Sequence, residues 1–116
     1  NKLLSEMRRS LENREPLGQM REKAEERAAI YRSYDDKKSL ALSLRDVAYV
    51  YQQNAEWGKS LKYSKKSLEL FRSLNSIRDA MINLQFIGRS AIQMGDYQTS
   101  IDSYNENLTL SRFLQG

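Results

Sequence analysis

The chain matches itself when it is shifted by forty residues, and this internal repeat limits the folds that it can adopt. The segments that close the units read IYRSY, LFRSL and LSRFL, with Arg32, Arg72 and Arg112 at one shared phase. A fixed period of this size is typical of a stacked array, in which each unit buries its apolar face against its neighbours. We therefore expect a single array with repeats at about 1–40, 41–80 and 81–116.

The amino-acid composition excludes several classes of site. The chain has no cysteine and no histidine, which removes a disulfide framework, zinc sites of the Cys/His type, thiol nucleophiles and the commonest general base. Five glycines and one proline in 116 residues disfavour a turn-rich β-sandwich and a glycine-rich phosphate loop. The composition predicts an all-α, non-catalytic protein without a metal or a cofactor.

Apolar residues recur at steps of three and four, which is the spacing of one helix face. The clearest example is the set Leu40, Leu44, Val47, Ala48 and Tyr51, after which the sequence turns polar. A second helical pattern follows about twenty residues later, so each unit reads as two antiparallel helices joined by a tight turn. The predicted helices cover about 2–14, 16–34, 37–54, 56–74, 77–94 and 97–114.

Small and polar residues occupy positions that support this phase. Ala48 and Gly88 lie one period apart, where a small side chain lets a partner helix approach closely. The pairs Asp35-Asp36 and Asn75-Ser76 are of the N-cap type and stand where the next helix must begin. These signals agree with helices that pack closely and turn sharply.

The first unit follows the pattern less well than the other two. Arg8 and Arg27 occupy phases that are small elsewhere, so residues 1–40 are a degenerate hairpin, a capping element or a helix pair docked on something else. The chain begins without methionine, and we expect it to be a fragment of a longer protein. No apolar run approaches the length of a membrane span, and the missing cysteines suit a reducing compartment, so we expect a cytoplasmic protein.

The hairpins resemble the tetratricopeptide repeat (TPR) family. In the third unit the residues on the signature spacing are Leu84, Ile87, Gly88, Ala91, Gly95, Tyr97, Ser100, Tyr104 and Leu108, and in the second they are Leu44, Val47, Ala48, Tyr51, Trp57, Ser60, Ser64 and Leu68. The usual unit has about 34 residues, and the longer unit here is similar to that of the Pins/LGN polarity adaptors. The resemblance implies an α-solenoid of three antiparallel helix hairpins in a right-handed superhelix. It also implies an adaptor or scaffold that binds an extended peptide or a partner helix in a concave groove.

The resemblance places the groove on the first helix of each hairpin. The residues that it puts there are Arg45, Asp46, Tyr49, Gln52, Gln53, Gln85, Phe86, Arg89, Ile92 and Gln93. In the polarity adaptors asparagines flank the small residue, whereas here those phases carry Asp46 and Tyr49, then Phe86 and Arg89. Guanidinium groups, amides and aromatic rings suit a different and moderately acidic peptide or helix. The alternative is that these residues are simply solvated or pack between helices, without contacting a ligand.

Two other sets of basic residues admit a functional and a structural interpretation. The three repeated arginines either form a row for phosphate or carboxylate or, as we expect, cover the seam between units with their stems. Lys59, Lys62 and Lys66 share one helical stripe and form a possible basic surface for nucleic acid or the cytoskeleton, although such lysines are more often solvated. Nucleic acid is the less favoured partner. A peptide-sensing regulatory TPR domain is a further alternative to a passive scaffold.

Overall fold

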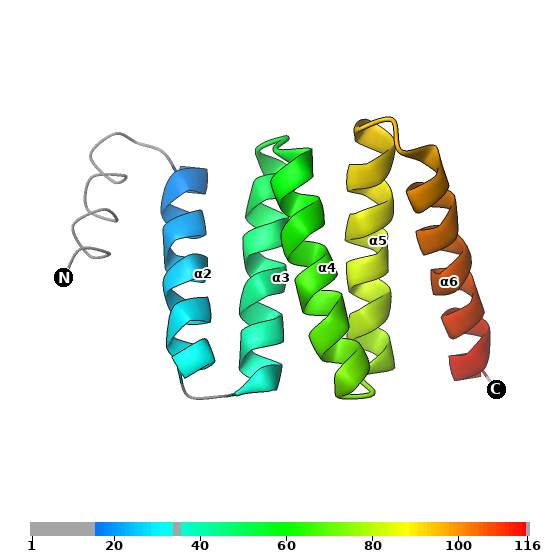
Figure 1. The fold of residues 1–116 in the computed structure, drawn as a ribbon, viewed down its shortest axis with the longest axis horizontal. Helices are drawn as coiled ribbons and strands as arrows, with labels where there is room; N and C mark the ends of the chain where they lie inside the picture. Colours follow the sequence, from blue (N-terminus) through cyan, green and yellow to red (C-terminus); the bar gives the residue numbers. More distant parts are fainter. Residues whose placement is uncertain (1–15, 34–35, 116) are drawn as a thin grey trace.

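The computed structural model describes residues 16–33 and 36–115, and these residues form a row of α-helices (Figure 1). The helices are α2 (Pro16–Ser33), α3 (Lys37–Gln53), α4 (Trp57–Ser73), α5 (Ile77–Gln93) and α6 (Tyr97–Gln115). Their bounds agree with the prediction from the apolar pattern to within one residue. The predicted helix at 2–14 lies outside the described residues. The all-α prediction is confirmed for the part of the chain that the structure describes.

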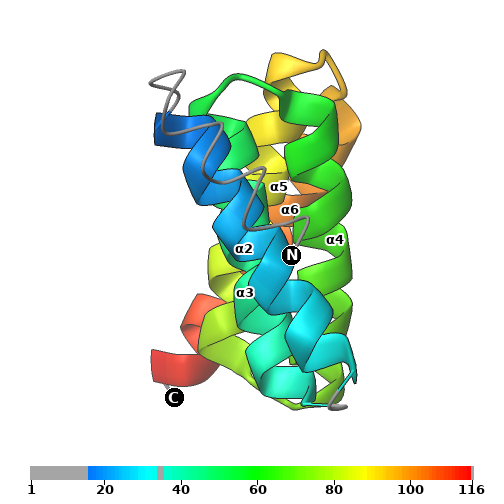
Figure 2. The same cartoon turned by 90° about the vertical axis from the view of Figure 1, so that its left-hand side faces the viewer.

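Successive helices run antiparallel, and each packs on the next one along the chain (Figures 1 and 2). The one further helix pair in contact within the described ranges is α3 with α5. The molecule measures 48 × 33 × 19 Å and has a radius of gyration of 15.2 Å, against about 13 Å for a compact domain of this size. The elongation follows from packing that is confined to neighbours in the row.

The turns that join α3, α4, α5 and α6 share one geometry, which repeats every twenty residues. Each contains one residue in the left-handed region, with φ of 57° at Ala55, 54° at Asn75 and 80° at Gly95. The next residue donates its backbone N–H to a carbonyl five residues earlier, always at 2.9 Å: Glu56 to Tyr51, Ser76 to Phe71, and Asp96 to Ala91. This is the Schellman arrangement. Asn75, which the sequence suggested as a cap for the following helix, therefore closes α4 instead.

The starts of α3 and α6 are capped by aspartate. Asp36 accepts hydrogen bonds from the Ser39 backbone at 3.0 Å and from its hydroxyl at 2.9 Å, and Asp96 accepts one from the Thr99 backbone at 3.2 Å. These bonds satisfy amides that have no partner inside the helix. At the start of α5 the Ser76 hydroxyl instead donates to the carboxylate of Asp79 at 2.6 Å. The predicted capping role of Asp36 is confirmed, and Asp35 lies outside the described residues.

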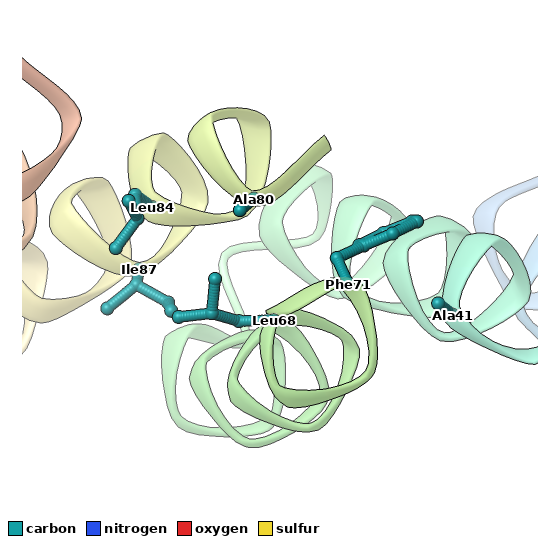
Figure 3. Close-up of a cluster of buried hydrophobic side chains, with 6 residues drawn as sticks. All are labelled: Ala41, Leu68, Phe71, Ala80, Leu84 and Ile87. Carbon is teal, nitrogen blue, oxygen red and sulfur yellow. The ribbon is translucent and has the colours of Figure 1, made fainter. Parts of the chain in front are cut away.

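The main apolar core lies where α4 packs between α3 and α5. It contains Ala41 of α3, Leu68 and Phe71 of α4, and Ala80, Leu84 and Ile87 of α5, all buried. Figure 3 shows Leu68 pointing toward Ile87. Burying a large apolar side chain of this kind stabilises the fold by about 1.5–3 kcal/mol, so this cluster holds the two hairpins together.

Small residues allow close approach at the helix seams. The buried hydroxyls of Ser60 and Ser67 donate to backbone carbonyls of α3, at 2.8 Å to Ala48 and 2.6 Å to Ala41. A Cβ atom at Gly88 would stand 2.8 Å from the ring of Tyr104 on α6. The predicted role of Gly88 as a site of close helix contact is therefore confirmed.

Candidate functional site

The first helices α3 and α5 present side chains at equal phases, forty residues apart. We use the name α3–α5 face for the set Asp46, Tyr49, Gln53, Phe86, Arg89 and Gln93. All are exposed except Phe86, which is half-buried. The helices α3 and α5 contact each other, and within this set the rings of Tyr49 and Phe86 meet across that contact.

An aromatic pair lies at the centre of the α3–α5 face. The ring centroids of Tyr49 and Phe86 are 6.3 Å apart and the rings are tilted by 38°. Tyr49 keeps 44% of its surface exposed, so the pair offers an apolar platform with a hydroxyl attached. Aromatic side chains with one wet edge are typical anchors of protein interfaces.

Arg89 lies beside this pair and forms no ion pair within the described ranges. It lines a hollow of about 360 Å³ together with Gln52, Gln85, Phe86, Tyr104 and Asn107. The Asn107 side-chain oxygen is buried without a hydrogen-bond donor. The hollow therefore presents the Arg89 guanidinium, which can bind a carboxylate of a ligand, whereas the Asn107 oxygen is closed off from solvent.

Two of the residues predicted for the groove are engaged within the protein. The Arg45 guanidinium contacts the Asp79 carboxylate at 2.9 Å and lies 5.3 Å from the Phe71 ring. Gln52 is only 5% exposed, and its amide donates to the Phe86 carbonyl at 3.3 Å and to the Ser90 hydroxyl at 3.2 Å. Both side chains connect α3 to α5. We therefore leave them out of the candidate binding surface.

The remaining predicted groove residues lie at the edges of the face. Asp46 forms an exposed ion pair with Arg27 of α2 at 3.6 Å. Gln53, Gln85, Gln93 and Ile92 are exposed. Gln85 and Ile92 stand forty residues after Arg45 and Gln52, the two side chains that join α3 to α5. Of the two, Gln85 lines the hollow together with Gln52 of α3.

The lysine stripe on α4 covers tyrosine rings. Lys59 lies 5.4 Å from the Tyr51 ring and 3.5 Å from the Glu56 carboxylate, while Lys62 and Lys66 lie 5.8 and 5.7 Å from the Tyr63 ring. The Tyr51 and Tyr63 rings are themselves stacked at 5.6 Å. Cation–π contacts of this kind account for the position of the stripe without any ligand.

The shifted pKa values all have local structural causes. Hydrogen bonds from Ser39 hold the pKa of Asp36 below its ordinary value, and those from Thr99 do the same for Asp96. The amide of Asn54 lowers the pKa of Glu56, and burial raises the pKa of Tyr51. Within residues 16–33 and 36–115, no three groups of the metal-binding kind come together. None of the described helices is long and apolar enough to cross a membrane.

Sequence reasoning missed two residues that line the hollow, Tyr104 and Asn107 of α6. The sequence does mark Tyr104 as unusual, because the residue forty positions earlier, in α4, is the small Ser64. No comparable signal marks Asn107 in the sequence. Its position depends on how closely α6 approaches α5 at Gly88.

Comparison with family models, with curated protein sequences and with solved structures finds no match to this chain.

Proposed function

We propose that this protein is a non-catalytic scaffold of the TPR kind that holds an extended peptide or a partner helix on its α3–α5 face. The observation that carries the proposal is the exposed Arg89, which forms no ion pair with the described residues, beside the Tyr49–Phe86 aromatic pair. An apolar anchor next to a free guanidinium suits a ligand in which a carboxylate stands close to an apolar side chain. The ligand class is therefore a moderately acidic peptide or helix.

Several observations support the repeat assignment on which this proposal rests. The helices α3 and α5 are offset by forty residues, as are the starts of α4 and α6. Small residues at Ala48 and Gly88 occupy one phase and both are buried. A right-handed solenoid built from such hairpins presents its first helices on one side, which is the side that bears the α3–α5 face.

The hollow gives the ligand a point of attachment. Arg89 supplies planar donors that match a carboxylate. A peptide that places an acidic side chain at Arg89 gives this guanidinium a charged partner. Such a ligand gains charge-assisted hydrogen bonds without requiring any movement of α3 or α5.

Selection of peptides from a random display library against the purified chain tests this function. We expect the selected peptides to combine acidic with apolar residues. Arg89→Gln should weaken their binding by about tenfold or more, because a hydrogen bond to a charged group is lost. Tyr49→Ala should weaken binding as well.

Arg112→Gln is the matched control, because it removes an exposed arginine that lies outside the α3–α5 face, and it should leave the Kd unchanged. The double variant Lys62→Glu, Lys66→Glu tests the alternative function, in which the lysine stripe is the binding surface. If this variant abolishes binding while Arg89→Gln and Tyr49→Ala do not, the proposed face is wrong. A steep loss of affinity for single-stranded nucleic acid with added salt would then assign the lysine stripe as the binding surface.

A further inference from the structure

A second hollow, of about 310 Å³, lies between α4 and α6 and is floored by α5. We call it the α4–α6 groove. Both helices pack on α5 without close backbone contact with each other, so they form its two walls. The apolar floor consists of Leu68, Leu84 and Ile87, which are buried and belong to the core cluster (Figure 3). The groove shares no lining residue with the hollow at Arg89, so it is separate from the α3–α5 face.

The preceding unit shows what fills the equivalent position. Forty residues before Ile87 and Ser103 stand Val47 and Tyr63. Tyr63 packs against the cluster that contains Val47, and its ring stacks on the Tyr51 ring with the centroids 5.6 Å apart. In the α4–α6 groove the small Ser103 takes the place of this tyrosine, and the hollow lies between it and the floor. A planar side chain therefore fits the space that Ser103 leaves open.

The charges around this position are reversed between the two units. In α4, the ammonium groups of Lys62 and Lys66 lie 5.8 and 5.7 Å from the Tyr63 ring. Their counterparts forty residues later are Asp102 and Glu106, and both line the groove. Carboxylates attract a planar group that carries positive charge. The groove therefore suits a planar cation, whereas the preceding unit holds a neutral ring.

The two cations that line the groove already face acids of the protein. The Arg72 guanidinium binds the Glu106 carboxylate. Hydrogen bonds from Thr99 lower the pKa of Asp96, and the nearby charge of Lys65 lowers it further. Arg72 and Lys65 are thus placed at acids other than those in the middle of the groove.

Three polar groups of the groove remain open to a ligand. Glu69 and Asp102 form no ion pair with the described residues, and Asp102 accepts only from the neutral Gln98 amide, at 2.8 Å. Ser103 is only 7% exposed, and its hydroxyl has no hydrogen-bond partner among the described residues. Unlike the Asn107 oxygen, this hydroxyl is not closed off from solvent.

We propose that the α4–α6 groove is a docking site for an arginine side chain in a basic peptide segment of a partner protein. The guanidinium is planar and charged and has five N–H donors, so it can donate to the Asp102 or Glu69 carboxylate and to the Ser103 hydroxyl. Its apolar stem covers Leu68 and Ile87. Lysine matches the site less well, because its ammonium is compact and is not planar.

The size of the groove distinguishes this occupant from a further helix. One turn of α-helix with its side chains is about 10 Å across and about 5.4 Å long, which exceeds the volume of the groove. Helices α4, α5 and α6 already surround the site, and each described helix packs mainly on its neighbours along the chain. The groove therefore accepts a single extended side chain and not another unit of the row.

Titration of the isotope-labelled chain with N-acetyl-argininamide, followed by NMR, tests the recognised group directly. We expect saturable shifts of the Ser103 and Ile87 signals, and the affinity should fall with added salt. N-acetyl-lysinamide should bind more weakly. The citrulline analogue keeps the planar shape without the charge and should give no saturable shift. Equal binding of the arginine and citrulline compounds would overturn the proposal.

Two sets of variants locate the binding. Ser103→Tyr copies the arrangement at Tyr63, so it should abolish the shifts and leave the thermal midpoint nearly unchanged. Glu69→Gln combined with Asp102→Asn should raise the Kd about tenfold or more, because a charge-assisted hydrogen bond is lost. This pair keeps the test decisive if a tyrosine at position 103 does not fit.

Glu26→Gln on α2 is the matched control, because it removes an acid from a helix that does not line the groove, and it should leave the Kd unchanged. Binding that survives both Ser103→Tyr and the loss of the two acids would overturn the proposal. Self-association of the chain without any added compound, if Asp102→Asn abolishes it, would assign the groove to a second copy and overturn the proposal as well.

Discussion

The guanidinium of Arg72 on α4 donates to both carboxylate oxygens of Glu106 on α6, at 2.6 and 2.5 Å. This ion pair joins α4 and α6, the second helices of consecutive hairpins, whose backbones make no close contact among the described elements. It gives one of the three repeated arginines a structural partner in the next hairpin. The side chain of Arg32 lies outside those that the structure describes.

Arg72→Ala and Glu106→Ala should each destabilise the protein modestly, and together they should show a coupling free energy of about 0.2–1 kcal/mol. The value is small because both side chains are partly exposed and solvent screens the pair. A double-mutant cycle by urea unfolding measures it, and added salt should reduce it. Arg112→Ala should cost nothing measurable. A coupling of zero at low salt would contradict the structural role of Arg72.

Gly88→Ala should lower the free energy of unfolding by about 1–2 kcal/mol. The new Cβ would stand 2.8 Å from the Tyr104 ring, and overpacking of this kind costs about 1–3 kcal/mol. The better helix propensity of alanine offsets at most about 1 kcal/mol of this cost. Gly58→Ala is the matched control, since its Cβ meets only the Met94 methyl at 3.8 Å, and it should stabilise the protein or leave it unchanged. Urea unfolding compares the two variants, and equal effects would contradict the predicted clash.

Asp79→Asn should destabilise the protein at neutral pH by about 1 kcal/mol and should flatten its loss of stability in acid. Hydrogen bonds from the Ser76 hydroxyl and from Arg45 lower the pKa of this partly buried carboxyl. A lowered pKa contributes stability that is present above the unfolded pKa of about 3.9 and is lost as the pH falls below it. Unfolding free energies measured from pH 7 to pH 3 should therefore converge for the variant and the parent. Parallel curves would show that Asp79 is not the responsible group.

Tyr51→Phe should cost about 1 kcal/mol near neutral pH, because the buried hydroxyl donates to the Glu25 carboxylate at 2.9 Å. Burial, with the nearby Glu25, raises the pKa of Tyr51 well above its usual range. A tyrosine with a raised pKa stabilises the fold fully below its unfolded pKa of about 10 and loses this contribution at higher pH. The parent should thus lose stability more steeply than Tyr51→Phe between about pH 10 and 11.5. If Tyr51→Phe and the parent lose stability equally with rising pH, the buried hydroxyl does not control the alkaline transition.

Much of the fold could be predicted from local patterns. The steps of three and four between Leu44, Val47, Ala48 and Tyr51 place these residues on one face, and all of them are buried. The acid at Asp36 marks the start of α3 through a bond to a residue three positions away. Signals of this kind involve neighbours along the chain, so they can be read without knowledge of tertiary contacts.

The candidate site was less predictable, because a helix has more than one polar side. Arg45 and Tyr49 were both predicted to face the groove, yet Arg45 reaches Asp79 while Tyr49 stays exposed beside Phe86. Which polar side becomes an interface depends on the direction from which α5 approaches α3. That direction is a property of packing, and residue spacing within α3 contains no information about it.

The sequence by itself determined the helices, their forty-residue offset and the small residues at the seams, because these follow from backbone geometry and from contacts close in the chain. Only the tertiary structure decided that Arg45 and Gln52 are used internally, that Arg89 forms no ion pair with the described residues, and that Leu68 is buried while Leu108 is exposed. The physical reason is that the same residue can recur at one position of successive units, as Leu68 and Leu108 do. The burial of each side chain depends on whether another helix packs against it.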